Sequence, residues 1–311
     1  MKKILAGLLA AMVLCGCFAG CSLRDRYQHT YTFTDDLGRT VSVKQQPEKV
    51  AALLGSFAQL WHLAGGQLTA ACNDAFEELK VPLKEGMVKL GSTKWLSLDL
   101  VLELRPDLVL ASVHSKQHLQ WKETLEKENI PVAFFDGNSF ESYLRILKIC
   151  TDLTGCTDRY ETYGSAQQAD VEAVRNRAVS TDAPRVLVMR ASATAIRAKK
   201  SDDTVAGMVL RELGCVNVAD APDVFADFNH VTMDEVVALD PDFIFVIPSG
   251  NDQNGMQEHL SDIFGKDPRW TELTAVENSH AYVLDKRMFQ FKPNELWADV
   301  YETIENYLFG A

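Results

Sequence analysis

The sequence predicts an α/β protein with two lobes, each built around a parallel-type sheet, joined by one long helix. The first indication is a pattern that occurs twice, at 98–110 and 233–245. Asp, Val, Leu, Pro and Asp fall on the same five positions in both copies. Each copy is typical of a short helix, a Pro-Asp turn and a buried strand, because proline ends helices and the strand residues are apolar throughout. A repeated helix–strand unit indicates two similar lobes with a cleft between them.

The first half of the chain shows the alternation of strands and helices that predicts a parallel sheet. A hairpin is expected first, with its strands at 31–34 and 39–43 around the turn residues 35–38. Apolar strand-like runs follow at 50–54, 68–71, 108–111 and 132–135. Helical stretches lie between and after them at 56–64, 97–104, 119–128 and 139–153.

A long helix is expected next, because residues 158–179 contain no strand signal and their apolar residues recur at helical spacing. Such a helix would be about 30 Å long. A second lobe follows, with strands at 185–189, 216–219, 243–247 and 281–284 and helices at 204–213, 233–239 and 294–308. The expected domains are therefore an N-terminal lobe at 22–157, a linker helix at 158–180 and a C-terminal lobe at 181–311.

The first 21 residues have the pattern of a lipoprotein signal peptide. Lys2 and Lys3 form a basic start, and the apolar run 4–16 is short for a membrane span. Two cysteines follow small residues, and Cys21 is the favoured lipidation site, with Cys17 as the alternative. Residues 22–28 would then be a tether. The predicted location is the extracytoplasmic face of the cell membrane, with a lipid anchor.

Charge and cysteine content exclude several classes of function. The net charge of −12 becomes −14 without Lys2 and Lys3, which argues against a nucleic-acid partner. Cys72, Cys150, Cys156 and Cys215 remain beyond the signal region, and only Cys150 and Cys156 are near enough in sequence to suggest a disulfide. No Cys-x-x-Cys occurs, so spacing gives no support to a zinc or redox site.

Several segments resemble the solute-binding lipoproteins of ABC importers for ferric siderophores, haem and cobalamin. In the first half of the chain the resemblance lies in residues 33–41, 47–50, 90–92 and 104–109. In the second half it lies in residues 239–242, 267–270, 281–283 and 292–297. It covers the mature chain in the expected order. It implies a class III periplasmic binding protein fold, no enzymatic activity, no cofactor and a monomer. The implied partners are an ABC permease, its ATPase and a small-molecule metal chelate.

The ligand implied by the resemblance is a bulky metal chelate, with an iron-siderophore or haem first and a corrinoid such as cobalamin as the alternative. A lipid-anchored α/β hydrolase or metal-dependent enzyme is the alternative of another class. No Gly-x-Ser-x-Gly, phosphate-binding or dinucleotide-binding motif supports catalysis. A haem or metal relay protein without a permease is a third possibility.

The candidate ligand-binding residues follow the carboxyl ends of predicted strands, where the cleft of such a fold lies. They combine aromatic rings, cations and hydrogen-bonding groups, which suit a bulky anionic chelate. A histidine among them could also be an axial metal ligand. The set comprises Ser56, Phe57, Asp74, Lys94, Trp95, His114, Arg190, Lys199, Phe228, His230 and Arg287.

Asp99 and Asp234 occupy equivalent positions in the two repeats, each in the first turn of its helix. A carboxylate there offsets the helix dipole in any protein. In the resembling family an acidic residue at this position on each lobe docks onto arginines of the permease, so both interpretations apply. Glu235 is a possible substitute for Asp234.

The signal region generates a test of membrane attachment. Replacing both Cys17 and Cys21 with serine should release the protein from the membrane, because the several acyl chains of a lipoprotein are needed for stable anchoring. The measurement is fractionation of cells followed by immunoblotting, with each single variant alongside. Unchanged membrane retention of the double variant would refute the lipid anchor.

Overall fold

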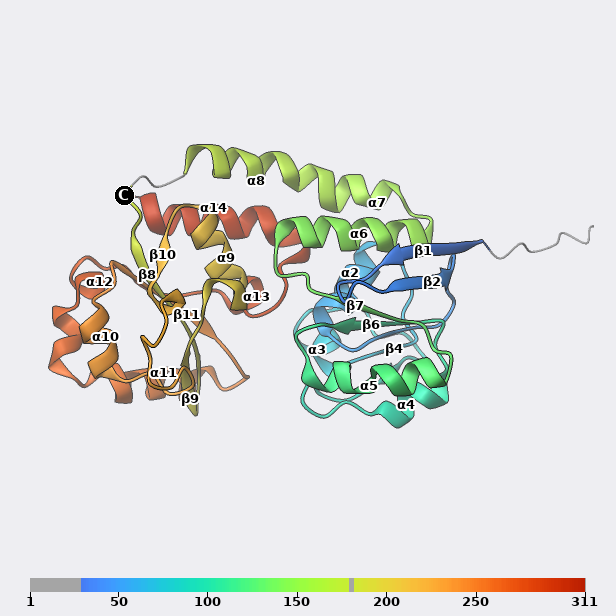
Figure 1. Cartoon of the computed structure of the whole chain (residues 1–311), viewed down its shortest axis with the longest axis horizontal. Helices are drawn as coiled ribbons and strands as arrows, with labels where there is room; N and C mark the ends of the chain where they lie inside the picture. The colour runs from blue at the N-terminus through green and yellow to red at the C-terminus, as the bar shows by residue number, and fades with distance from the viewer. Residues whose placement is uncertain (1–28, 179–181, 311) are drawn as a thin grey trace, which may run out of the picture. The chain divides into compact units, whose positions relative to one another are not determined.

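The structure is a computed structural model that describes residues 29–178 and 182–310. Residues from Tyr31 onward form one compact unit, and two five-stranded sheets organise it (Figure 1). The predicted signal peptide, tether and lipidation sites lie outside the described residues. No helix in the described ranges has the length and apolar character that crossing a membrane requires.

The N-terminal lobe has a parallel sheet in the order β5-β4-β3-β6-β7. The predicted strands are present, and β5 is an additional strand of two residues. The strands are β3 (Val50–Ala52), β4 (Ala70–Ala71), β5 (Val88–Lys89), β6 (Leu108–Ser112) and β7 (Val132–Phe135). The helices are α2 (Gly55–Leu63), α3 (Asn73–Glu77), α4 (Leu98–Leu104), α5 (Lys116–Lys127) and α6 (Phe140–Thr154). The predicted hairpin forms a separate sheet from β1 (Thr30–Thr34) and β2 (Thr40–Lys44).

The C-terminal lobe has a sheet in the order β10-β8-β11-β12, parallel throughout, with β9 added antiparallel to β8. The strands are β8 (Arg185–Ser192), β9 (Ala195–Ala198), β10 (Val216–Asn217), β11 (Phe243–Pro248) and β12 (Ala281–Val283). The main helices are α9 (Val205–Glu212), α10 (Met233–Leu239), α11 (Gln253–Leu260), α12 (Thr274–Glu277), α13 (Lys286–Phe289) and α14 (Trp297–Phe309). The two sheets confirm the predicted fold class.

The repeated Pro-Asp turn has the same structural role in both lobes. Each helix ends at a residue with left-handed backbone, Arg105 with φ 45° and Asp240 with φ 38°. The aspartate after the proline then accepts backbone N–H groups near the start of a neighbouring strand. Asp107 accepts from Glu48 and Lys49 at 2.9 Å, and Asp242 accepts from Arg185 at 2.7 Å. The sequence repeat therefore corresponds to the same hydrogen-bonded contact between the end of a helix and a neighbouring strand in both lobes.

The predicted long linker helix is present and contains a π-helical turn. It consists of α7 (Asp158–Tyr160), a π-helical turn η1 (Glu161–Ser165) and α8 (Ala166–Arg177). The Tyr163 carbonyl accepts hydrogen bonds from the Tyr143 hydroxyl at 2.7 Å and the Gln167 amide at 2.6 Å. The π-turn therefore joins the linker to α6 of the N-terminal lobe.

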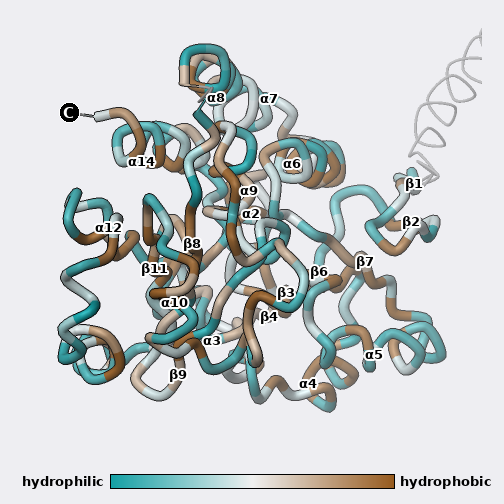
Figure 2. Tube along the Cα trace, turned by 60° about the vertical axis from the view of Figure 1, so that its left-hand side comes forward, coloured by the Kyte–Doolittle hydropathy of each residue, from teal (hydrophilic) through white to brown (hydrophobic). Residues whose placement is uncertain are grey.

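One hydrophobic cluster spans both lobes, and each lobe also has a cluster of its own. The shared cluster contains buried residues of both sheets together with Val171 and Val174 of α8 and Ile304 of α14. Helix α14 packs along α8, and Figure 1 shows both helices beside α6. In Figure 2 the strands β6, β7 and β8 are strongly hydrophobic, in agreement with their buried residues. Relative movement of the lobes would therefore disturb shared apolar packing.

A second connection between the lobes, which we call the bridge segment, runs over residues 286–297 and includes η6 (Asn294–Leu296). Although expected in the C-terminal lobe, it packs against α2 of the other lobe. The buried Asn294 amide donates to the Ser56 carbonyl at 2.9 Å and to Gln59 Oε1 at 2.8 Å. Asn294 has φ 55°, a conformation that asparagine tolerates better than most residues. Gln167 of α8 donates to its carbonyl at 3.3 Å, so the linker and the bridge segment are joined as well.

The sequence left open whether Cys150 and Cys156 form a disulfide, and in the structure they do not. All four cysteines of the described ranges are free thiols, and Cys72, Cys150 and Cys215 are buried.

Candidate functional site

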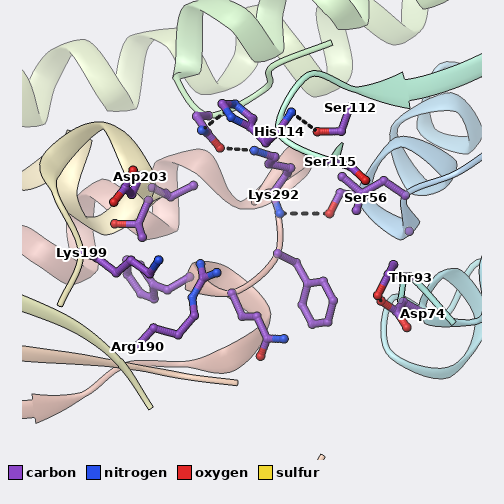
Figure 3. Close-up of a pocket in the computed structure, with 18 of the residues that line it drawn as sticks. Ser56, Asp74, Thr93, Ser112, His114, Ser115, Arg190, Lys199, Asp203 and Lys292 are labelled. Atoms are coloured by element: carbon purple, nitrogen blue, oxygen red, sulfur yellow. Dashed lines mark hydrogen bonds between the residues drawn. The ribbon is translucent and has the colours of Figure 1, made fainter. Parts of the chain in front are cut away.

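A cavity of about 690 Å³ lies between the two lobes and is lined by both (Figure 3). Its size is within the range of small-molecule binding sites. The N-terminal lobe contributes Leu54, Gly55, Ser56, Asp74, Thr93, Ser112, His114, Ser115 and Asn138. The C-terminal lobe contributes Arg190, Lys199, Asp202, Asp203, Thr204 and Val205, and the bridge segment contributes Phe289, Gln290, Phe291 and Lys292.

The N-terminal wall is formed by loops that follow parallel strands. Residues 54–56 follow β3, Asp74 follows β4, Ser112–Ser115 end and follow β6, and Asn138 follows β7. Because the carboxyl ends of parallel strands meet at one edge of a sheet, side chains far apart in sequence come together there. The N-terminal wall therefore has the geometry that the choice of candidate residues assumed.

His118 is a buried residue that fixes the loop after β6. The ring Nδ1 of His118 accepts the backbone N–H of Ser112 at 3.0 Å. The backbone N–H of His118 donates to Ser115 Oγ at 3.3 Å. Its ring must therefore be neutral at Nδ1. Burial lowers the pKa of His118 to about 4, so the neutral form is the stable one at physiological pH.

A chain of polar groups crosses the cavity from one lobe to the bridge segment. His114 Nε2 lies 2.5 Å from Asp136 Oδ1 and 3.0 Å from Asn138 Nδ2. The Asn138 Oδ1 accepts a hydrogen bond from Lys292 Nζ (Figure 3). The hydrogen bond from His114 lowers the pKa of Asp136, so this carboxylate remains ionised. The Lys292 backbone N–H also donates to Ser56 Oγ at 3.0 Å.

Three cations, Arg190, Lys199 and Lys292, face the cavity near one another. Burial lowers the pKa of each, and the charge of Arg190 lowers the pKa of both lysines further. The buried Nε of Arg190 has no hydrogen-bond partner, and none of the three forms an ion pair with a residue in 29–178 or 182–310. These are the properties of an anion-binding surface, because half-buried cations without an ion-pair partner are stabilised by a counter-charge.

Three carboxylates also line the cavity, but they are held elsewhere. Asp202 pairs with Arg211 at 2.7 Å, and Asp203 accepts the Lys200 backbone N–H at 3.1 Å. Asp74 lies on the N-terminal wall, accepts the Thr93 hydroxyl at 3.2 Å, and has its pKa raised by burial. Asp203 lies on the same lobe as Arg190 and Lys199, and its charge raises the pKa of both, although it forms no ion pair with either. The cavity therefore has its cations toward the C-terminal lobe and the bridge segment, where Asp203 balances part of their charge.

Five of the predicted ligand-binding residues line this cavity: Ser56, Asp74, His114, Arg190 and Lys199. The other six do not. Phe57 is buried in the core against Phe135, and Arg287 is held by Gln59 at 2.8 Å and Glu295 at 3.1 Å. Phe228 packs on Phe225, His230 pairs with Asp227 at 2.7 Å, and Lys94 and the 81% exposed Trp95 face solvent beside Thr93.

Sequence reasoning missed Lys292, Asn138, Ser112 and Thr93, all of which line the cavity. Asn138 and Ser112 stand at strand ends, so the rule that selected His114 could have found them. Lys292 follows no strand, and its place in the cavity depends on the path of the bridge segment. No local signal could have indicated it.

The predicted docking residues lie on the surface of separate lobes. Asp99 and Asp234 are exposed in the first turns of α4 and α10, after the capping residues Ser97 and Thr232. Arg269 contacts Asp234 at 2.7 Å. Glu235 is not a free substitute, because its carboxylate accepts the backbone N–H groups of Thr232 and Ala226 at 2.9 Å.

Comparison with known proteins places these features in a family. Residues 50–288 match the family model described as periplasmic binding protein. A putative ABC transporter substrate-binding lipoprotein of Bacillus subtilis (strain 168), YhfQ, is 24% identical over 94% of this chain and 93% of its own. The iron(3+)-hydroxamate-binding protein FhuD of the same organism is 23% identical over 91% of this chain and 89% of its own. The siderophore-binding protein BauB, solved with ferric iron and acinetobactin, superposes with a TM-score of 0.70 at 16% identity, covering 91% of this chain and 100% of that one.

The environment of His118 predicts a component of acid sensitivity. The folded state keeps His118 neutral down to about pH 4, whereas the unfolded chain binds the proton near the ordinary value of 6.5. Stability from this group is therefore complete above pH 6.5 and is lost as the pH falls toward 4. The loss by pH 4.5 should be about 2 kcal/mol.

The measurement is urea unfolding at pH 7 and pH 4.5 for the wild type and for His118→Asn. Asparagine can still accept the Ser112 N–H but does not titrate, so its acid-induced loss should be smaller by about 2 kcal/mol. His29→Asn is the control, because His29 is exposed to solvent. Equal losses in wild type and His118→Asn would contradict the assignment.

Proposed function

The chain belongs to the periplasmic binding protein family, and we propose that it captures an anionic iron chelate outside the cell membrane and delivers it to an ABC permease. The family match, the two-lobed fold and the interlobe cavity support the capture of a solute. Relatives carry the names of ABC transporter substrate-binding lipoproteins and of an iron(3+)-hydroxamate-binding protein. Membership of this family carries no catalytic role, and the chain is proposed to act without turnover.

The observation that carries the ligand assignment is the group of unpaired cations in the cavity. Arg190, Lys199 and Lys292 would meet acidic oxygens of a ligand without first breaking an ion pair, and Lys292 has only the neutral Asn138 side chain as a hydrogen-bond partner. Hydrogen bonds to charged groups contribute about 1.5–3 kcal/mol each, so such a group discriminates strongly for anions. The cavity volume of about 690 Å³ suits a chelate and exceeds the needs of a single amino acid.

An iron-siderophore is favoured over haem within this assignment. His114 is the one histidine among the cavity-lining residues, and Asp136 and Asn138 already engage its Nε2. Use of that nitrogen as an axial ligand would require both contacts to break. A corrinoid is less consistent with the free cations, which call for a negatively charged ligand.

Membrane attachment and docking complete the proposed cycle. The names of the relatives as lipoproteins support a lipid anchor at Cys21, or at Cys17, with the folded part on the extracytoplasmic face. Asp99 and Asp234 are proposed to dock onto cations of the permease, one from each lobe. Asp234 would exchange or share its contact with Arg269, while the exposed Asp99 is directly available.

The ligand assignment is tested by fluorescence titration of the full-length protein in detergent. The probes are a hexadentate ferric tris-catechol chelate, ferric citrate, cationic ferric desferrioxamine B, haemin and cobalamin. We expect an anionic ferric chelate to bind more tightly than the cationic one, and Arg190→Ala to weaken its binding about ten- to a hundredfold.

Arg197→Ala is the matched control. Arg197 of β9 lies opposite Arg190 of β8 in the register of the sheet, but it does not line the cavity. X-ray scattering should show only a small decrease in radius of gyration, because the lobes share a core and two connections. Preference for the cationic chelate, or binding of sugars or amino acids alone, would reject the ligand class. A large closure would reject only the rigidity argument.

Docking is tested by reversing both charges, Asp99→Lys with Asp234→Lys. Uptake of the radioactive iron chelate by cells should be abolished, while its affinity for the purified variant should change less than about threefold. The pair Asp170→Lys and Glu172→Lys is the control, because these exposed linker residues give the same change in net charge. A large loss of chelate affinity in the Asp99→Lys, Asp234→Lys variant would overturn the docking role. An equal loss of uptake in the control variant would overturn it as well.

A further inference from the structure

Lys292 occupies a position in the cavity that differs from that of the other cations. It lies in the bridge segment, between α13 and η6, and this segment connects the two lobes. Its N–H donates to Ser56 Oγ at 3.0 Å, and its Nζ donates to the neutral side chain of Asn138. The ammonium thus has a fixed position at the floor of the cavity and only a neutral hydrogen-bond partner (Figure 3).

The charged groups around Lys292 do not cancel its charge. Asp136, at the end of β7, attracts it from the N-terminal lobe, but this carboxylate is engaged by His114. Arg190 of β8 opposes it from the C-terminal lobe, with Lys199 beyond β9 adding a second cation to that wall. Within its own segment, Arg287 and Glu295 pair with each other at 3.1 Å.

The balance of these effects leaves Lys292 readily deprotonated in the empty cavity. Burial is the main cause that lowers its pKa, to about 8, and Arg190 adds to this effect while Asp136 opposes it. A lysine in this state is divided between its charged and neutral forms at mildly alkaline pH. An anion placed beside it would favour the charged form.

We infer that Lys292 is a specificity-determining residue that binds an acidic group of the ligand and takes up a proton from solvent when the ligand enters. This inference rests on the proposed function and deepens it, because it assigns an anionic group to the floor of the cavity. The step is balanced: the neutral amine gains one proton supplied by the buffer, and the resulting ammonium pairs with an acidic oxygen of the ligand. Ligand affinity is thereby linked to pH through one residue.

Linkage gives the direction of the effect. Below pH 7 the amine is already protonated in the free protein, so binding takes up little. Above pH 8 binding of each ligand requires Lys292 to take up a proton from the buffer, so the affinity should fall by up to about tenfold per pH unit. Near pH 8 the uptake should be about half a proton per ligand.

The first experiment is calorimetric titration of the full-length protein in detergent with the hexadentate ferric tris-catechol chelate at pH 8. Parallel titrations in HEPES and Tris, whose ionisation heats differ, give the number of protons taken up. We expect about half a proton for the wild type. Lys292→Arg should bind within about threefold of the wild type at pH 7 with no uptake, because arginine is always charged. Lys292→Met should bind at least tenfold more weakly.

Two controls locate the proton. Lys94→Arg changes an exposed lysine outside the cavity and should leave the uptake unchanged. Lys199→Arg should retain most of it. Disappearance of the uptake in Lys199→Arg but not in Lys292→Arg would assign the proton to Lys199 and overturn the inference. Wild-type binding without proton uptake would also overturn it.

The second experiment needs no iron chelate, and therefore separates this inference from the proposed function. Nuclear magnetic resonance of protein labelled with ¹³C at lysine Cε should show a lysine that titrates near pH 8 and is absent from Lys292→Arg. Sodium citrate is the anionic probe and should raise this midpoint. If no chelate binds but citrate shifts Lys292, the proposed ligand class fails and the anion contact stands. An ordinary midpoint near 10.5, unchanged by citrate, would refute the inference.

Discussion

The arrangement of the cavity depends on the contact of the bridge segment with α2. Asn294 donates to Ser56 and Gln59, and Arg287 and Glu295 meet the same Gln59 side chain. Buried amides of this kind are costly unless every partner is present, so the network specifies one position of the segment on the N-terminal lobe. That position places Phe289–Lys292 at the floor of the cavity. The binding surface is therefore set by a polar network adjacent to it.

The same network restricts how the lobes can move. The linker reaches the bridge segment through Gln167, and Arg175 of α8 contacts Glu141 of the N-terminal lobe at 2.8 Å and Glu212 of the C-terminal lobe at 2.6 Å. A shared apolar core lies among these contacts. Hinge closure of large amplitude would break several of them together. Ligand selection must then come mainly from the side chains already in the cavity.

Those side chains form a polarised surface. The N-terminal wall presents hydroxyls, an amide and a histidine already bonded to a carboxylate, whereas the opposite wall and floor present unpaired cations. A ligand with acidic oxygens on one side fits this division of charge. Because Lys292 lacks a carboxylate partner at bonding distance in the described structure, the ligand itself is the natural counter-charge.

The sequence by itself determined the two α/β lobes, most strand positions and five cavity residues, because these depend on local periodicity and on the rule that parallel strands end at one edge. It could not show that Phe57 packs in the core against Phe135 or that Arg287 is held by Gln59, 228 residues away, because both contacts depend on tertiary packing. It also could not show that the linker contains a π-turn, which contacts Tyr143 of α6. Lys292 is the clearest case. Its neighbours in sequence give no sign of a binding role, and only the return of the chain across the cleft brings its ammonium to Asn138, 154 residues away.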